Sequence, residues 1–209
     1  MRNLILVGGG GHCNSVIDVA ECAGFNILGI LDQPEMVGKD VLSYKVVGTD
    51  DNIPDYVGIA EFVITVGQIK SYTTRQTIAS KIINAGGRLA TIIAPDARVS
   101  KYATIGKGTV VLHKAIVNTS VVIGENCIVN TLADIEHGTT IGNFCHISTG
   151  AMVNGDCRIS DGCFIGSQAV LSQGVTLHTN TVIGAGSVVL HEIKSSGVYA
   201  GNPIQQIGE

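Results

Sequence analysis

The residues best suited to chemistry lie in one segment, Asn130 to Ala151, which contains Glu136, His137 and His146. An imidazole gains and loses a proton near neutral pH, so an accessible histidine can serve as a general base. A carboxylate beside it, such as that of Glu136, can orient the ring and stabilise its charged form. The segment therefore indicates acid–base chemistry in which a proton leaves an attacking nucleophile.

The chain around this segment repeats an aliphatic residue at every sixth position, seventeen times without interruption. A small or β-branched residue follows four positions after each of the first sixteen. A six-residue period of this kind is typical of a parallel β-helix, in which short strands turn corners and coils stack about 4.8 Å apart. We expect the aliphatic residues to fill its core: Ile93, Val99, Ile105, Val111, Val117, Ile123, Val129, Ile135, Ile141, Ile147, Val153, Ile159, Ile165, Leu171, Leu177, Ile183 and Val189.

The six cysteines have no C-x2-C spacing, so we expect no metal site. Cys127, Cys145 and Cys163 recur at every third repeat of the period and are expected to stack inside the β-helix at one corner position. A thiolate would be poorly solvated there, which disfavours nucleophilic catalysis by cysteine.

Residues 1 to 90 are organised differently, with strands that alternate with helices. This order predicts a small Rossmann-like parallel α/β sheet, which binds ligands beyond the carboxyl ends of its strands. The expected strands are residues 3–7, 27–31, 46–48 and 61–66, and the expected helices are residues 15–24 and 73–85.

Four glycines, Gly8 to Gly11, join the first expected strand to the first helix. They let the backbone approach a phosphate or a sugar closely, while the helix N-terminus supplies aligned N–H groups. His12 directly after the glycines and Asp32 after the second strand would face the same crevice. The run is not a dinucleotide-binding fingerprint, because a required glycine falls on Cys13.

Composition narrows the choice of partners. The formal net charge of −4 offers no basic surface for nucleic acid or for an anionic membrane, so we expect neither partner. The N-terminus has no long apolar segment and no cleavage site of the signal-peptide type, which predicts a cytoplasmic protein.

The six-residue period and its motifs resemble the hexapeptide-repeat acyltransferases. This resemblance implies a left-handed, triangular β-helix with about 18 residues per coil, so that equivalent residues of successive coils lie one above the other. Gly155 then lies one coil above His137. Because a glycine has no side chain to intervene, its N–H could act there as an oxyanion donor.

Taken with the α/β domain, the whole chain resembles the sialic acid O-acetyltransferase and UDP-bacillosamine N-acetyltransferase group of sugar acetyltransferases. The motifs that carry the resemblance are the G-G-G-G-H turn, the L-D pair at Asp32, V-G-Q with a downstream Arg75, and the E-H pair at Glu136 and His137. The resemblance implies acetyl transfer from acetyl-CoA to a sugar, with His137 as the general base.

The resemblance also assigns the two domains and their contacts. Residues 1–90 would bind the nucleotide-sugar acceptor, and residues 91–209 would bind acetyl-CoA and carry out catalysis within a homotrimer whose sites are shared between subunits. The implied acetyl-CoA contacts are His146, Gly155, Ser167 and Ala185. The implied acceptor contacts are Gly11, His12, Cys13, Asp32, Gln33 and Gly67.

One departure from the family pattern concerns Gly138, which stands where an acidic residue usually follows the histidine. Either Glu136 or Asp134 substitutes for it, or the enzyme is slower, or its acceptor differs; we favour Glu136 as the residue that orients His137. Gln33 stands where a second aspartate is common, which leaves the sugar open. We predict transfer to the amine of a UDP-linked 4-amino sugar. The alternatives are O-acetylation of sialic acid and a non-catalytic nucleotide-sugar-binding trimer.

Overall fold

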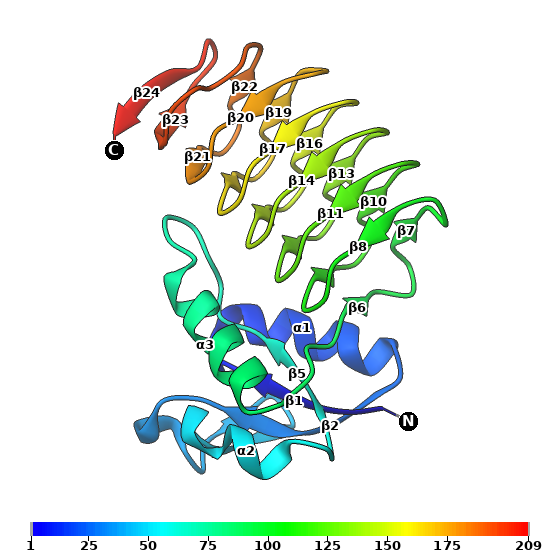
Figure 1. The fold of residues 1–209 in the computed structure, drawn as a ribbon, viewed down its shortest axis with the longest axis vertical. Coiled ribbons are helices and arrows are strands. Elements are labelled where there is room, and N and C mark those ends of the chain that lie inside the picture. Colours follow the sequence, from blue (N-terminus) through cyan, green and yellow to red (C-terminus); the bar gives the residue numbers. More distant parts are fainter. Residues whose placement is uncertain (1, 209) are drawn as a thin grey trace. The chain divides into compact units, whose positions relative to one another are not determined.

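The computed structural model describes residues 2–208, which form two compact units (Figure 1). The first unit comprises the residues up to Gly67 together with Thr73–Pro95. The second comprises Gln68–Tyr72 together with the residues from Asp96 onward. Each unit has its own arrangement of strands and its own buried core.

The first unit is a mainly parallel sheet with helices, as predicted. Its strands run in the order β3-β4-β2-β1-β5, with β1 parallel to both of its neighbours and β3 antiparallel to β4 at the edge. The elements are β1 (Arg2–Val7), α1 (Gly11–Cys22), β2 (Phe25–Leu31), β3 (Asp40–Val41), β4 (Tyr44–Gly48), α2 (Ile53–Tyr56), β5 (Glu61–Ile64), α3 (Thr73–Asn84) and β6 (Ile92–Ile93), with short 3-10 turns at Pro34–Met36 and Asp50–Asn52.

Helix α1 begins at Gly11, one turn before its predicted start. The apolar stripe of the helix explains this, because Cys13, Val16, Ile17 and Ala20 are all buried and follow the spacing of one helix face. The buried face of the helix therefore begins at Cys13, soon after the glycine run and within the first turn of the helix. The prediction of this helix was right in kind and wrong at its N-terminal boundary.

The second unit is a left-handed parallel β-helix of short strands. Apart from the last strand, each strand pairs in parallel with the equivalent strand of the neighbouring coil, for example at Val117 and Ile135; the last strand pairs antiparallel with the one before it. One face is formed by β7, β10, β13, β16, β19 and β22, and a second by β8, β11, β14, β17 and β20. The third face includes β9, β12, β15, β18, β21, β23 and β24.

Most of these strands are short and lead directly into a turn. They are β7 (Arg98–Val99), β8 (Thr104–Ile105), β9 (Val110–Val111), β10 (Ile116–Val117), β11 (Val122–Ile123), β12 (Ile128–Val129), β13 (Asp134–Ile135), β14 (Thr140–Ile141), β15 (His146–Ile147), β16 (Met152–Val153), β17 (Arg158–Ile159), β18 (Phe164–Ile165), β19 (Val170–Leu171), β20 (Thr176–Leu177), β21 (Thr181–Ile183), β22 (Val188–Val189), β23 (Gly197–Ala200) and β24 (Gln205–Gly208).

The aliphatic series forms the core of the β-helix, as predicted, from Val111 to Val189. Val99 and Ile105 in the first coil are only partly buried, since no coil of the β-helix precedes theirs. Ile93 is 37% exposed, so its predicted core position was wrong. It belongs to β6, where Ile92 is the buried residue and the next side chain must point the opposite way.

The predicted cysteine stack is present in the core. Cys127, Cys145 and Cys163 have no exposed surface, and the Cys145 N–H donates to the sulfur of Cys127 at 3.4 Å. Each thiol also donates to a backbone carbonyl in the following coil, at 3.0–3.1 Å. Small size and a satisfied S–H group explain why cysteine fits this corner position.

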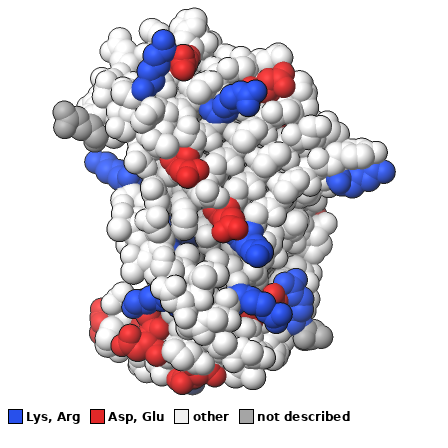
Figure 2. Space-filling view, viewed as in Figure 1, with Lys and Arg blue, Asp and Glu red and all other residues white. Residues whose placement is uncertain are grey.

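Two features of the whole chain bear on its partners. On the face drawn in Figure 2 acidic and basic side chains are interspersed over a largely uncharged surface, so the electrostatic field there has no single sign. Within residues 2–208, no helix has the length and apolar character needed to cross a membrane.

Candidate active site

His137 stands at a corner of the β-helix, between β13 on one face and β14 on the next. Ile135 anchors this turn in the core, and Gly138 completes it with a φ of +69°, a conformation that glycine adopts without strain. The Gly138 N–H donates to Thr119 O in the preceding coil. The corner therefore presents the His137 side chain to solvent on a fixed backbone.

The imidazole of His137 lies against Gly155, one coil further along. A β-carbon on Gly155 would lie 2.6 Å from Cε1 and 2.7 Å from Nε2 of the ring. The Gly155 N–H has no acceptor within residues 2–208. The register expected from the sequence thus places an imidazole next to a backbone N–H that has no acceptor in residues 2–208.

Glu136 does not contact the ring that it was expected to orient. Its Oε2 accepts from Asn118 Nδ2 at 2.8 Å and from the backbone N–H of His137 at 3.4 Å. The carboxylate is therefore held against the preceding coil. The preference for Glu136 as the orienting residue has no support in this geometry.

Asp134, the other acidic candidate, lies on the sheet face between Ile116 and Met152 in the neighbouring strands. Its Oδ1 is buried and has no hydrogen-bond partner within residues 2–208. Burial, reinforced by the nearby charge of Glu136, raises the pKa of the Asp134 carboxyl above its ordinary value. No hydrogen bond joins this Oδ1 to His137 in the described chain.

His146 is buried on β15, and both of its ring nitrogens are engaged within the second unit. Nδ1 lies 2.8 Å from Gln68 O and must donate to it, so Nε2 accepts from Asn130 Nδ2 at 3.0 Å. The ring also packs edge-to-face against Phe164, with 5.1 Å between centroids. Because His146 lies on the third face and His137 at the corner of the other two, one β-helix presents them on different sides.

The remaining predicted acetyl-CoA contacts follow the same face. Ser167 Oγ hydrogen-bonds Ser148 Oγ at 3.0 Å, and Ala185, at the equivalent position of the next coil, is exposed. The segment that carries Gln68 is held to this region, since Gln68 Nε2 donates to Phe144 O at 2.6 Å and Tyr72 stacks on Phe144. A packed aromatic surface near His146 was not expected from the sequence, because Tyr72 lies outside the repeats.

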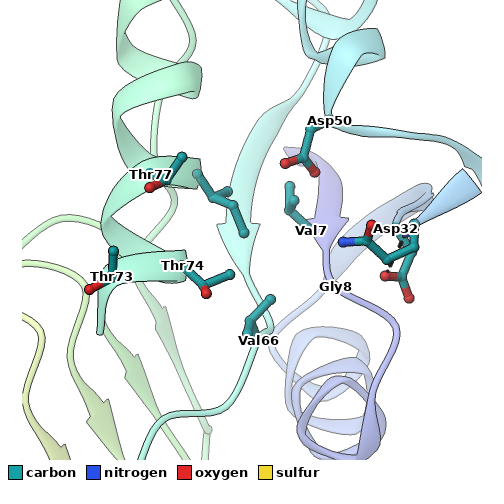
Figure 3. A pocket seen from close by; sticks show the side chains of 10 residues that line it. Val7, Gly8, Asp32, Asp50, Val66, Thr73, Thr74 and Thr77 are labelled. Carbon is teal, nitrogen blue, oxygen red and sulfur yellow. Dashed lines mark hydrogen bonds between the residues drawn. The ribbon is translucent and has the colours of Figure 1, made fainter. Parts of the chain in front are cut away.

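The first unit contains a cavity of about 240 Å³ at the carboxyl ends of its strands. Figure 3 shows threonines of α3 on one side and Asp32 and Asp50 on the other, with Val7, Gly8 and Val66 between them. Its full lining is Val7, Gly8, Asp32, Gln33, Asp50, Val66, Thr73, Thr74, Thr77 and Ile78. The location is the one expected for a parallel sheet.

Asp32 and the glycine run form one backbone arrangement. The Gly9 N–H donates to Asp32 Oδ2 and the Gln33 N–H to Asp32 Oδ1, both at 2.8 Å. Gly8 has a φ of +108°, and a β-carbon there would lie 2.6 Å from Val66 Cγ2. Only glycine combines this positive φ with such close packing against Val66, so position 8 requires glycine. The N–H groups of Gly9 and Gln33 hold the Asp32 carboxylate in place at the cavity edge.

The other predicted acceptor residues do not line the cavity: three lie outside it and one is buried in the core. Gly11 begins α1 and is exposed, while His12 and Gly67 lie close together, with 3.8 Å between His12 Cβ and the β-carbon position of Gly67. None of these three lines the cavity. Cys13 is fully buried, its N–H donates to Gly10 O, and burial raises the pKa of its thiol to about 11.

Four polar cavity residues were missed by sequence reasoning: Asp50, Thr73, Thr74 and Thr77. A signal for Asp50 was available, since it follows β4, whose carboxyl end lies at the same edge of the sheet. The threonines carry no such signal, because a polar first turn of a helix is common.

The sequence matches two described families. Residues 3–82 match the PglD N-terminal domain, and residues 156–191 match the bacterial transferase hexapeptide family of six repeats. Fold and matched segments together define a hexapeptide-repeat acyltransferase with an N-terminal α/β domain.

Solved structures share this architecture over the whole chain. The acetyltransferase domain of PglB from Neisseria gonorrhoeae is 31% identical with a TM-score of 0.90, and the match covers 99% of this chain and 100% of that one. PerB from Caulobacter crescentus, solved with CoA and GDP-perosamine, is 28% identical with a TM-score of 0.92 over 100% and 98% of the two chains. The PglB domain has also been solved with acetyl coenzyme A.

Among curated protein sequences no match is found. The identity to the PglB domain over its full length is sufficient to assign the family. The chain belongs to the sugar acetyltransferases of the PglB and PglD group, which confirms the family predicted from the sequence.

Proposed function

We propose that this chain transfers the acetyl group of acetyl-CoA to the amine of a nucleotide-linked amino sugar, with His137 as the general base. The observation that carries the proposal is the contact between the exposed His137 ring and Gly155, whose N–H has no acceptor in residues 2–208. Attack on a thioester needs a proton acceptor for the nucleophile and a hydrogen-bond donor for the developing oxyanion. These two groups supply both functions.

The proposed reaction proceeds without an acyl-enzyme. The neutral amine forms a bond to the thioester carbon while His137 takes the proton that this nitrogen loses. The negative charge that develops on the carbonyl oxygen is stabilised by the Gly155 N–H. The carbon–sulfur bond then breaks, and the imidazolium returns its proton to the thiolate of CoA.

Acetyl-CoA is proposed to contact the second unit at His146, Gly155, Ser167 and Ala185. Since both ring nitrogens of His146 already hydrogen-bond within the unit, we assign its contact to the face and edge of the ring. Ala185 has no polar side chain, so its contribution would come from the backbone. The complex of the PglB domain with acetyl coenzyme A supports this choice of acyl donor.

The acceptor is proposed to bind the first unit, with contacts from Gly11, His12, Asp32, Gln33 and Gly67. The N-terminus of α1 after the glycine run offers N–H groups to a phosphate. The hydroxyl and carboxylate groups in the cavity suit the hydrogen-bond donors and acceptors of a nucleoside. The complex of PerB with GDP-perosamine supports a nucleotide-linked amino sugar as the acceptor class.

A homotrimer is proposed as the working form. His137 and His146 lie on different sides of one β-helix, so a site that uses both needs two subunits. The outer faces also expose apolar side chains, among them Ile116 at 39%, Val122 at 45% and Met152 at 46%, which a neighbouring subunit would cover.

The cytoplasm is proposed as the location. All six cysteines are free thiols, which fits a reducing compartment.

The acceptor class is tested by release of free CoA thiol from acetyl-CoA, with UDP-linked and GDP-linked 4-amino sugars and sialic acid as separate acceptors. We expect turnover with an amino sugar carried by one of the two nucleotides. Turnover with sialic acid alone would instead establish O-acetylation. Binding of acetyl-CoA without turnover of any acceptor would favour a non-catalytic nucleotide-sugar-binding trimer.

A further inference from the structure

The space beside Gly138 is filled by a carboxylate from another coil. Asp156 occupies the position equivalent to Gly138 in the following coil, and its N–H donates to His137 O at 2.8 Å, which ties the two corners together. A β-carbon built on Gly138 would collide with Asp156 Oδ1 and would lie 3.4 Å from Cγ. The Asp156 carboxylate therefore occupies the volume into which a side chain at position 138 would extend.

The side chains of His137 and Asp156 run in opposite directions between the same two coils. The His137 ring extends to Gly155 in the following coil, and the Asp156 carboxylate extends to Gly138 in the preceding one. Gly155 and Asp156 are consecutive, as are His137 and Gly138, so the ring and the carboxylate project from neighbouring corner positions; no hydrogen bond or ion pair joins them within residues 2–208. The φ of +59° at Asp156 turns the chain at this corner, and aspartate tolerates that conformation better than most residues.

The other acidic groups near His137 are held elsewhere. Glu136 accepts from Asn118 in the preceding coil, and Asp134 lies within the sheet face. The positions equivalent to His137 in the preceding and following coils are Thr119 and Gly155, which carry no charge.

Asp156 keeps one carboxylate oxygen unused. Its Oδ2 accepts from Gln173 Nε2 in a long contact of 3.4 Å, and its Oδ1 accepts no hydrogen bond within residues 2–208. Gln173 is neutral, so no cation in the described chain neutralises this carboxylate. It is therefore the negative charge available to a cation that forms at His137.

We propose that Asp156 is the positioning carboxylate of His137, supplied from the following coil in place of the residue missing at Gly138. A negative charge beside an imidazole stabilises the imidazolium that forms when the ring takes the proton of the acceptor, and it restricts the orientation of the ring. This inference rests on the proposed role of His137 as general base.

The test compares acetyl transfer by the wild type with that of Asp156→Asn over a range of pH. We expect kcat to fall roughly tenfold, the effect of losing interactions equivalent to one pKa unit, and the acidic limb of the kcat/KM profile to move to lower pH. The imidazole would then protonate less readily without the nearby anion. A merely structural role for Asp156 would lower activity without moving that limb.

A second substitution at position 138 tests whether the charge of a carboxylate, rather than the shape of its side chain, is needed for activity. Gly138→Asp in the Asp156→Gly background should restore most of the lost kcat, because removal of the side chain at position 156 frees the volume that a carboxylate at position 138 needs. Gly138→Asn in the same background is the matched control, since asparagine has the same shape and also tolerates a positive φ. We expect it to restore nothing.

Two results would overturn this inference alone: an Asp156→Asn profile identical to that of the wild type, or equal rescue by Gly138→Asn and Gly138→Asp. If Asp156→Asn does not fold, Asp156→Gly takes its place, because glycine accepts the φ of this corner. If the wild type transfers no acetyl group to any of the acceptors, the proposed function is rejected, and this inference with it.

Discussion

The imidazole of His137 lies so close to the backbone of Gly155 that a β-carbon on Gly155 would come within 2.6 Å of Cε1. The two residues are one coil apart, and the contact depends on the exact stacking of successive coils. The side chain proposed to take a proton and the N–H proposed to stabilise an oxyanion are thus positioned by a single structural repeat.

This contact makes Gly155→Ala a sensitive probe of the site. The added methyl group would displace the ring and restrict access to the Gly155 N–H, so we expect kcat to fall roughly 10²- to 10³-fold, as when one oxyanion donor is lost. The melting temperature should change little, because the φ of Gly155 lies outside the left-handed region. A variant with near-normal kcat would show that neither the ring position nor the N–H matters for turnover.

Nucleotide binding in the cavity of the first unit can be tested with a substitution on α3. Thr77 lines the cavity, whereas its neighbour Gln76 is exposed and does not. Thr77→Phe should abolish the rise in melting temperature that the cognate nucleotide, UDP or GDP, produces in the wild type, because binding to the folded state is the source of that rise. Gln76→Phe is the matched control and should keep it. An undiminished rise in Thr77→Phe would place the nucleotide elsewhere.

Mixed assemblies of two variants test whether the proposed homotrimer shares each site between subunits. If His137 comes from one subunit and His146 from the next, an equal mixture of His137→Ala and His146→Ala chains would rebuild about one site in four. We expect mixing after reversible dissociation to recover about a quarter of wild-type activity from two inactive proteins. Activity that stays at the level of the separate variants would show that both histidines act within one chain.

Asp134 predicts a pH-dependent effect on stability. Burial raises the pKa of this carboxyl, so the folded chain binds the proton more tightly than the unfolded chain does, and the charged form destabilises the fold at neutral pH. Asp134→Asn should therefore melt roughly 1–2 °C higher at pH 7, a small effect because the group is partly solvated.

The difference in melting temperature should shrink as the pH falls through the raised pKa. It should vanish below the ordinary aspartate pKa of about 3.9, where the carboxyl is protonated in both states. A melting temperature that is lower for Asp134→Asn at pH 7 would mean that the carboxylate has a stabilising partner in the assembled protein.

The register of the β-helix was predictable because it depends on a single repeated constraint. Every sixth side chain must be aliphatic to fill a core of constant width. Combined with the 18-residue coil that the family resemblance implies, this interval predicted the position of Gly155 one coil above His137. The same arithmetic applied to Gly138 identifies Asp156. The prediction was instead restricted to acidic residues next to His137 in the sequence, and it therefore favoured Glu136.

Other parts of the site were not predictable from local patterns. The cavity brings Asp32, Asp50 and Thr77 together from separate crossovers, and their proximity depends on the strand order of the sheet rather than on any periodicity. The burial of His146 depends on the carbonyl of Gln68, which is distant in the sequence. Contacts of this kind arise from tertiary packing, for which the residue types alone give little information.

The most direct test of the central claim is the rate of CoA release by the wild type and by His137→Ala, at saturating acetyl-CoA and nucleotide-linked amino sugar. If His137 is the general base, its removal should lower kcat by roughly 10²- to 10⁴-fold while the melting temperature remains near that of the wild type. A His137→Ala protein that turns over the amino sugar at a rate close to the wild type would contradict the account.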